Sequence, residues 1–202
     1  MGLLKQALQD QLCADQSMDT LIPCPKLWAF GPAQAGDGVK TFPVTCAGNE
    51  LVLHLQGCYS PFDTSSLTET ARKSLTLKLP VIWEQQFAAL ESQLLAETAQ
   101  LSPQLFGTKY SEDDLRTRYK SITKKTGDYP MQLRAKVNTD GFYSCRYWDK
   151  DRQRLEPPDT HAGLNCTVAI RLRGLWVSPE NFGIVADCTD LQLIDEVAAC
   201  PF

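Results

Sequence analysis

The clearest pattern in the chain is an alternation of apolar and polar residues between positions 131 and 137. Successive side chains of a strand point to opposite faces, so this period of two predicts a half-buried strand. Arg134 and Lys136 fall on its polar side. The apolar positions, which we expect to point inward, are Met131, Leu133, Ala135 and Val137.

A turn and a second strand rich in aromatic residues follow. Residues 138–141 (Asn-Thr-Asp-Gly) have the chemistry of a tight turn, which predicts a β-hairpin over residues 129–148. Alternation in the second strand puts Arg146 and Trp148 on one face and Tyr143 and Tyr147 on the other, and Arg146 indicates that its own face is outside. Such a hairpin suits flexible nucleic acid. The alternative is an ordinary hairpin with core aromatics and solvated charges.

Similar alternation predicts further strands, about seven in all, together with helices. A long amphipathic helix is predicted by Trp83, Phe87, Leu90 and Leu94, which recur at helical spacing before Pro103. Other expected helices are a short one that starts at Ser111 and carries Leu115, Tyr119 and Ile122, and an N-terminal one over residues 1–20. The strands are expected at 51–56, 75–79, 166–177 and 182–193, with strand fragments and loop over 21–40 and a loop over 149–161.

The order of these elements favours a β-rich α+β fold. The long helix lies between groups of strands, and the regular strand-helix-strand alternation of a doubly wound sheet is absent from the pattern. A length of 202 residues fits one elaborated domain, residues 1–202, with a short C-terminal tail at 195–202.

Composition indicates a globular intracellular protein. Hydrophobic residues make up 43% of the chain, and no apolar run reaches the roughly 18 residues of a membrane span. The first residues lack the apolar core of a signal peptide, so we expect an intracellular site, the nucleus or a viral replication site if the source is eukaryotic or viral. The eight cysteines form no C-x-x-C pair, and we expect buried free thiols, with disulfides as the alternative.

Charge is distributed unevenly along the chain. The net charge is −4, but residues 109–173 hold 14 Lys and Arg against 9 Asp and Glu, a net charge of +5. The remainder holds 6 against 15, a net charge of −9. This asymmetry fits a basic binding face on an acidic body, and it also fits charges that are simply solvated.

Catalytic and cofactor motifs are absent from the sequence. It has no G-x-S-x-G, P-loop, H-E-x-x-H or G-x-G-x-x-G motif, and its two histidines, His54 and His161, lie in unrelated contexts. We therefore expect no enzyme, no cofactor and no metal site.

The order of several short motifs resembles the replicative single-stranded DNA-binding proteins of phycodnaviruses and related large DNA viruses. Those proteins are in turn similar to the T7-type phage single-stranded DNA-binding protein. The resemblance spans roughly residues 83–194 and implies an OB-fold, a small β-barrel that binds single strands on an exposed sheet. Its motifs are Phe106-Gly107, Tyr129-Pro130 with Leu133 and Lys136-Val137, Gly174-Leu175-Trp176, Phe182-Gly183-Ile184 and Gln192.

The resemblance places Lys136 on the binding strand and Tyr129 at its start. Arg146 and Trp148 are candidate contacts on physical grounds, because rings stack on bases and cations bind phosphates. Trp176 and Phe182 we interpret as core packing. The predicted nucleic-acid-binding residues are Lys124, Lys125, Tyr129, Arg134, Lys136, Arg146, Trp148, Arg171 and Arg173.

Two functional hypotheses follow. The first is a sequence-tolerant single-stranded DNA-binding protein of replication or recombination, whose tail, ending in Phe202, recruits replication proteins. The second is a non-catalytic structural or adaptor protein that uses a β-barrel as a scaffold.

Overall fold

The computed structural model describes residues 22, 27–36, 38–65, 72–141 and 143–194. The predicted helix at 1–20 and the tail at 195–202, with Phe202, lie outside the described residues. Within the described part of the chain, no helix is both long enough and apolar enough to cross a membrane.

Five strands are paired in a ring. They are paired in the order β5, β6, β9, β13, β12 and back to β5, and β9 and β13 run parallel while the other neighbours are antiparallel. The ring is partly open, since β5 and β6 share one register pair and β9 and β13 share two. This confirms the β-rich α+β class and the OB-like barrel. The five strands are β5 (Val52–Ser60), β6 (Arg72–Lys78), β9 (Gln132–Asn138), β12 (Leu164–Val177) and β13 (Phe182–Leu193).

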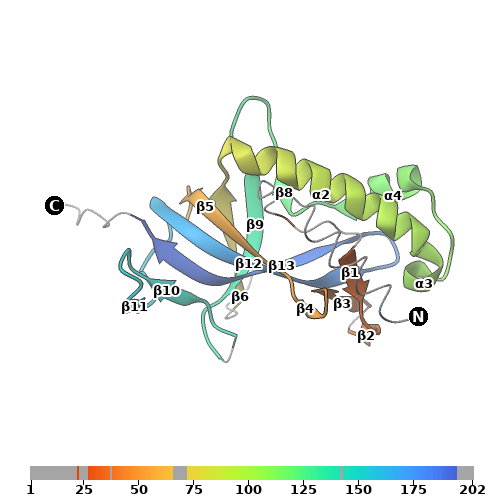
Figure 1. Cartoon of the computed structure of the whole chain (residues 1–202), viewed down its shortest axis with the longest axis horizontal. Helices are drawn as coiled ribbons and strands as arrows, with labels where there is room; N and C mark the ends of the chain where they lie inside the picture. Colours follow the sequence, from red (N-terminus) through yellow and green to blue (C-terminus); the bar gives the residue numbers. More distant parts are fainter. Residues whose placement is uncertain (1–21, 23–26, 37, 66–71, 142, 195–202) are drawn as a thin grey trace, which may run out of the picture.

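Short strands extend the ring at its edges (Figure 1). Near the start of the described chain, β3 pairs with β12 and is joined by β1, β2 and β4, while β7, β8, β10 and β11 extend the side formed by β9 and β13. These strands are β1 (Trp28–Phe30), β2 (Gln34–Ala35), β3 (Lys40–Cys46), β4 (Asn49–Glu50), β7 (Tyr119–Lys120), β8 (Thr123–Lys124), β10 (Arg146–Trp148) and β11 (Arg154–Leu155).

The long helix α2 (Val81–Gln100) lies along one side of the sheet in Figure 1 and buries its predicted apolar stripe, including Trp83 and Phe87. Two further helices follow, α3 (Ser102–Phe106) and α4 (Glu112–Arg118). The sequence interpretation missed α3 because it took Pro103 as a stop, yet proline is tolerated in the first turn of a new helix.

The start of α4 is as predicted, but its end is not. Ser111 caps the helix in a capping box with Asp114. The prediction that Tyr119 and Ile122 belong to this helix is wrong: Tyr119 begins β7, where it pairs with Phe182 of β13. Pairing with a long buried strand outweighs the weak helical spacing of these residues.

The predicted hairpin over residues 129–148 is also wrong. β9 pairs with β6, β8 and β13, whereas β10 runs parallel to β13 and pairs with β11. Alternation is a local signal that fixes which side chains point inward, and it does not choose the partner strand. Within β10 the inward and outward positions are as predicted, because Tyr147 is buried and Arg146 is exposed, but the prediction that Tyr143 shares the inner face is wrong, since Tyr143 lies before β10 and is exposed.

The barrel core holds most of the described cysteines. Cys58, Cys145, Cys166 and Cys188 are buried free thiols, as predicted, and Cys46 is half-buried. Burial raises the pKa of Cys58 and of Cys166 to about 12, so these thiols stay protonated at neutral pH.

We expect Gly183→Ala to destabilise the protein. A Cβ at Gly183 would lie 2.6 Å from the carbonyl oxygen of Lys120 and 3.0 Å from Trp176 Nε1, so β7 would have to move away from β13. Overpacking of this kind costs about 1–3 kcal/mol, measurable as a lower urea midpoint. The control is Gly31→Ala, whose Cβ would meet Pro43 at ordinary distances of 3.6 Å or more. Equal midpoints for the two variants would contradict this account.

Candidate nucleic-acid interface

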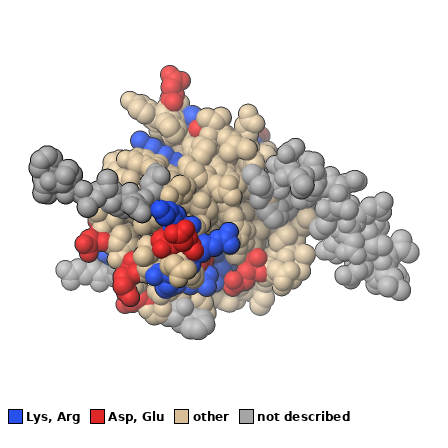
Figure 2. All heavy atoms as spheres, turned by 60° about the vertical axis from the view of Figure 1, so that its left-hand side comes forward, with Lys and Arg blue, Asp and Glu red and all other residues tan. Residues whose placement is uncertain are grey.

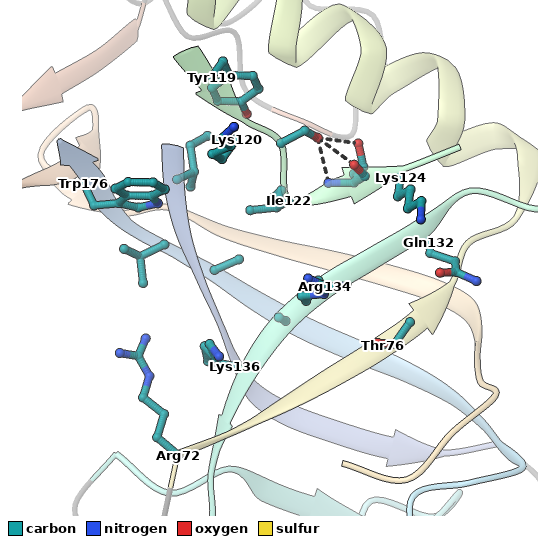
Figure 3. Close-up of a pocket in the computed structure, with 16 residues that line it drawn as sticks. Arg72, Thr76, Tyr119, Lys120, Ile122, Lys124, Gln132, Arg134, Lys136 and Trp176 are labelled. Atoms are coloured by element: carbon teal, nitrogen blue, oxygen red, sulfur yellow. Dashed lines mark hydrogen bonds between the residues drawn. The ribbon is translucent and has the colours of Figure 1, made fainter. Parts of the chain in front are cut away.

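A groove of about 630 Å³ opens on the outer surface between β9 and β13 (Figure 3). The start of β13 pairs with β7, and β13 meets β9 further along, at Asp187 and Cys188. Residues 184–186 of β13 lie between these two pairings and line the groove. The segment from Tyr119 to Lys124 forms a wall, and the outer faces of β6 and β9 continue the surface. We call this hollow the basic groove.

The basic groove is positively charged. Five cations from four strands line it, and among its described lining residues there is no Asp or Glu. Arg134 and Lys136 occupy outward positions of β9, opposite Thr76 and Ser74 of β6. The five cations, labelled in Figure 3, are Arg72, Lys120, Lys124, Arg134 and Lys136.

Among the described residues, most of these cations have no acidic partner. Lys136 Nζ donates a hydrogen bond of 2.7 Å to Ser74 Oγ, which holds the ammonium group on the outer face of the sheet. In the part of the chain that the structure describes, no carboxylate lies at ion-pair distance from Lys120, Lys124, Arg134 or Lys136. The exception is Arg72, whose Nη2 lies 2.7 Å from Asp187 Oδ1. The groove therefore offers cations to an anionic ligand.

Two aromatic residues, Tyr119 and Trp176, line the groove beside these cations. Trp176, on β12, is half-buried and faces the side of the groove where Arg72 lies in Figure 3. Its interpretation as core packing is therefore wrong, whereas Phe182 is fully buried as predicted. Tyr119 packs on Phe182 with ring centroids 5.4 Å apart, and burial raises the pKa of its phenol well above the usual value. Tyr119 is thus engaged in packing against Phe182, whereas Trp176 is the half-buried ring of the groove that could contact a ligand.

Two glutamates of α2 hold the wall of the groove in place. Glu91 accepts hydrogen bonds from Ser121 Oγ and, at 3.1 Å, from Thr123 Oγ1. Glu84 accepts from Lys125 Nζ at 2.8 Å and from the backbone N–H of Met131 at 2.9 Å. Burial raises the pKa of Glu91, whereas the hydrogen bond from Lys125 lowers the pKa of Glu84.

The structure brings three of the predicted site residues together and separates the others. Lys124, Arg134 and Lys136 line the basic groove. Lys125 faces α2 in its ion pair with Glu84, and the exposed Tyr129 lies in the connection between β8 and β9, outside the groove lining.

Arg146, Trp148, Arg171 and Arg173 lie elsewhere on the surface. Arg146 Nη2 and Trp148 Nε1 both donate to Asp190, at 2.7 and 3.0 Å, while Arg171 and Arg173 border another cavity. Figure 2 shows acidic side chains among the Lys and Arg side chains on one face, consistent with such pairing. The expectation of one continuous hairpin surface is therefore wrong, because β9 and β10 do not pair with each other and instead meet β13 at different points along its length.

Two cations and one ring of the groove were not predicted as site residues: Arg72, Lys120 and Trp176. Arg72 begins a polar row on β6 with Ser74 and Thr76, and that alternation is readable in the sequence. Lys120 lies in a two-residue strand, which is too short to show any period.

No family model matches the chain, and no curated protein matches it. Solved structures that are similar include the single-stranded DNA-binding protein from bacteriophage Enc34, at 13% identity and a TM-score of 0.44, covering 83% of this chain and 90% of that one. The structure of the same protein in complex with ssDNA matches at the same identity and TM-score. A third similar structure is gp2.5, a single-stranded DNA-binding protein encoded by bacteriophage T7, at 8% identity and a TM-score of 0.45, covering 71% of this chain and 86% of that one. TM-scores below 0.5 at such identities establish neither family nor function for this chain.

We expect Glu91→Gln to gain stability relative to the native protein as pH rises. The pKa of Glu91 in the folded state is raised, so its contribution is fully present below the unfolded-state value near 4.5 and is lost as pH rises through the folded-state value. Glutamine keeps an acceptor for Ser121 and Thr123 but cannot ionise. Urea unfolding at several pH values between 4.5 and 8 measures the difference.

Glu84→Gln is the control with the opposite sign. The pKa of Glu84 is lowered in the folded state, so its contribution is present above the unfolded-state value and is lost as pH falls. The native protein should therefore gain stability relative to Glu84→Gln as pH rises toward the unfolded-state value of 4.5, so the urea series for this variant includes pH values below 4.5. The same pH trend for both variants would show that the wall is not held as described.

Proposed function

We propose that this protein binds single-stranded DNA without sequence preference in the basic groove, as a non-enzymatic component of replication or recombination. The observation that carries the proposal is the juxtaposition of Lys120, Lys124, Arg134 and Lys136, without acidic partners in the described part of the chain, with the accessible ring of Trp176. Proteins that bind single strands combine a basic groove that follows the phosphates with rings on which bases stack.

The geometry favours single strands over duplex. A base can stack on Trp176 when it is unpaired, whereas in a duplex the base faces are covered by their neighbours. The cations come from β6, β7, β8 and β9 and follow the groove, so they can contact successive phosphates. Lys and Arg bind phosphate without reading the base, and stacking accepts any base, which supports sequence-tolerant binding.

The proposal extends to the biological setting that the sequence suggests. The motif order that resembles phycodnavirus-type proteins supports a replication role, at a viral replication site or in the nucleus. In this proposal the C-terminal segment 195–202, ending in Phe202, recruits replication proteins.

An adaptor protein is the second candidate. Val81 and Ile82, at the start of α2, expose large apolar side chains to solvent, which is typical of a surface that contacts another protein. The separation of β10 from β9 also removes part of the basic aromatic surface on which the DNA-binding hypothesis was first based.

Fluorescence anisotropy of labelled oligo-dT at several salt concentrations tests DNA binding. Phosphate contacts release counterions, with a slope of log affinity against log salt of about −0.7 per contact for single strands. We expect Arg134→Gln/Lys136→Gln to weaken binding at low salt and to make this slope shallower by about 1.4. The charge-matched control is Lys109→Gln/Arg116→Gln, two exposed residues outside the groove lining. Equal binding by both double variants would exclude the groove, and equal affinity for duplex would exclude selective single-strand binding.

Trp176 provides a separate test of base stacking. We expect Trp176→Ala to weaken oligo-dT binding by about 1–3 kcal/mol, whereas Trp176→Phe keeps most of the affinity because it keeps a ring. The label on the oligonucleotide reports binding in both variants, so loss of the tryptophan does not remove the signal. Circular dichroism checks that both variants are folded. Equal affinities for the alanine and phenylalanine variants would contradict stacking at this position.

A further inference from the structure

A row of four outward side chains crosses the sheet at one end of the basic groove. In antiparallel neighbours, residues that lie directly opposite each other share a face, with Cβ atoms about 5 Å apart. Tyr59 of β5 lies opposite Lys78 of β6, and Lys78 lies opposite Gln132 of β9. Gln132 in turn lies opposite Lys124 of β8. Because Gln132 and Lys124 line the groove, the row leads out of the groove to Tyr59.

This row and Trp176 lie at opposite ends of the groove. In Figure 3, Gln132 is on one side and Trp176 on the other, with the labelled cations of β9 between them. Lys136 and Gln132 are separated along β9 by about 13 Å of extended strand. A DNA strand that follows the β9 cations away from Trp176 therefore reaches Lys78 and Tyr59.

Tyr59 presents its ring at the surface. The residues before and after it on β5, Cys58 and Ser60, are buried, which directs the Tyr59 side chain outward. The side chain is 36% exposed, and Lys78 Nζ lies 5.5 Å from the ring centroid. Among the described residues, no hydrogen bond holds the phenol group and no second ring packs on it. The strand therefore fixes where the ring lies, while a cation contacts it.

The outward face of β6 and β9 carries no acidic side chain. Within the part of the chain that the structure describes, no carboxylate lies at ion-pair distance from Lys78, whose ammonium group contacts the Tyr59 ring instead. The surface between the groove and Tyr59 therefore suits an anionic strand. The outward residues of the two strands are Arg72, Ser74, Thr76, Lys78, Gln132, Arg134, Lys136 and Asn138.

We propose that Tyr59 and Lys78 form a second subsite for the same DNA strand, in which one base stacks on Tyr59 while a neighbouring phosphate lies at Lys78. The inference rests on the proposed function, because the strand must also occupy the basic groove. In this arrangement one base stacks at each end of the groove, on Trp176 and on Tyr59, and the phosphates between them meet the cations of β9.

The contact between Lys78 and Tyr59 is one that a bound strand can replace. A cation over an exposed ring is held more weakly than a base that stacks on an aromatic side chain. When a base takes the ring, the ammonium group on its flexible stem can turn to the phosphate beside that base. The pair thus offers a partner to both parts of a nucleotide, and neither partner reads the identity of the base.

An abasic strand separates stacking on Tyr59 from contacts with phosphates. The probes are labelled oligo-dT of about 16 nucleotides, the upper end of the range for one OB-fold, and a labelled strand of the same length whose sugars carry no base. We expect Tyr59→Ala to weaken oligo-dT binding about tenfold, the effect of losing one stacked base, and to leave binding of the abasic strand unchanged. Tyr59→Phe keeps the ring and should keep the affinity for both probes. Anisotropy at low salt measures these affinities.

Lys78→Gln tests the phosphate contact of the same subsite. It removes one cation, so it should weaken binding of both probes and make the slope of log affinity against log salt shallower by about 0.7. A native slope for this variant would contradict the phosphate contact.

The matched control for the ring is Tyr110→Ala. Tyr110 also lies beneath a cation, with the guanidinium carbon of Arg118 4.6 Å from its ring centroid, and it lies outside the groove lining. Its removal should leave both affinities unchanged, and thermal melting checks that each variant is folded. Native affinity of Tyr59→Ala for oligo-dT, or an equal loss for both probes, overturns the subsite while the groove stands. Failure of the native protein to bind oligo-dT overturns the proposed function, and the subsite with it.

Discussion

The antiparallel pairing of β12 with β13 is the interaction on which the rest of the structure depends. The two strands are joined by the turn at residues 178–181, where Ser178 and Asn181 exchange hydrogen bonds, and they pair over almost their full length. Irregularities in register near Ala169 and Gly174 interrupt the pairing, and such bulges bend and twist a strand pair. Because the pair bends, successive stretches of its outer edge meet different neighbouring strands.

The basic groove is a consequence of this bending. Along its outer edge β13 meets β7, then β9 and then β10, all of them parallel to it. Between the contacts with β7 and β9 the edge of β13 has room for a hollow, and β6 and β9 carry their cations to its rim. Gly183 permits the close approach of β7, because a side chain there would collide with the Lys120 carbonyl group. Backbone packing thus determines where the groove opens.

Local properties of the chain were predictable from the sequence, whereas partnerships between distant segments were not. The inward and outward sides of residues 131–137, the apolar stripe of α2 and the capping box at Ser111 depend on neighbours a few residues apart, and these predictions are confirmed. The pairing of β10 with β13 depends on residues more than forty positions away. Alternation carries no information on such a choice.

The candidate site was predictable to the same extent. The outward direction of Arg134 and Lys136 follows from alternation, and both line the groove. Whether a cation is available to a ligand depends instead on acids that are remote in sequence. Lys124 and Lys125 are neighbours, yet Lys125 meets Glu84 of α2 while Lys124 faces the groove. Trp176 was interpreted as a core residue because it is large and apolar and belongs to a strand whose other apolar residues are buried. Its partial exposure depends on the hollow beside β13, which the sequence does not show.

Because the groove wall is attached to α2, the same hydrogen bonds that stabilise the fold also keep the groove in shape. Glu84 and Glu91 lie on one helix, seven residues apart, and together they hold the segment from Ser121 to Met131 at the edge of the barrel. A wall that is already fixed does not have to be ordered when a flexible strand binds, so the entropy lost on binding comes mainly from the strand. Sequence-tolerant binding has no base-specific hydrogen bonds to offset a large ordering cost. For the proposed binding of single strands, a groove that the fold already holds open would let phosphate contacts and one stacked ring suffice.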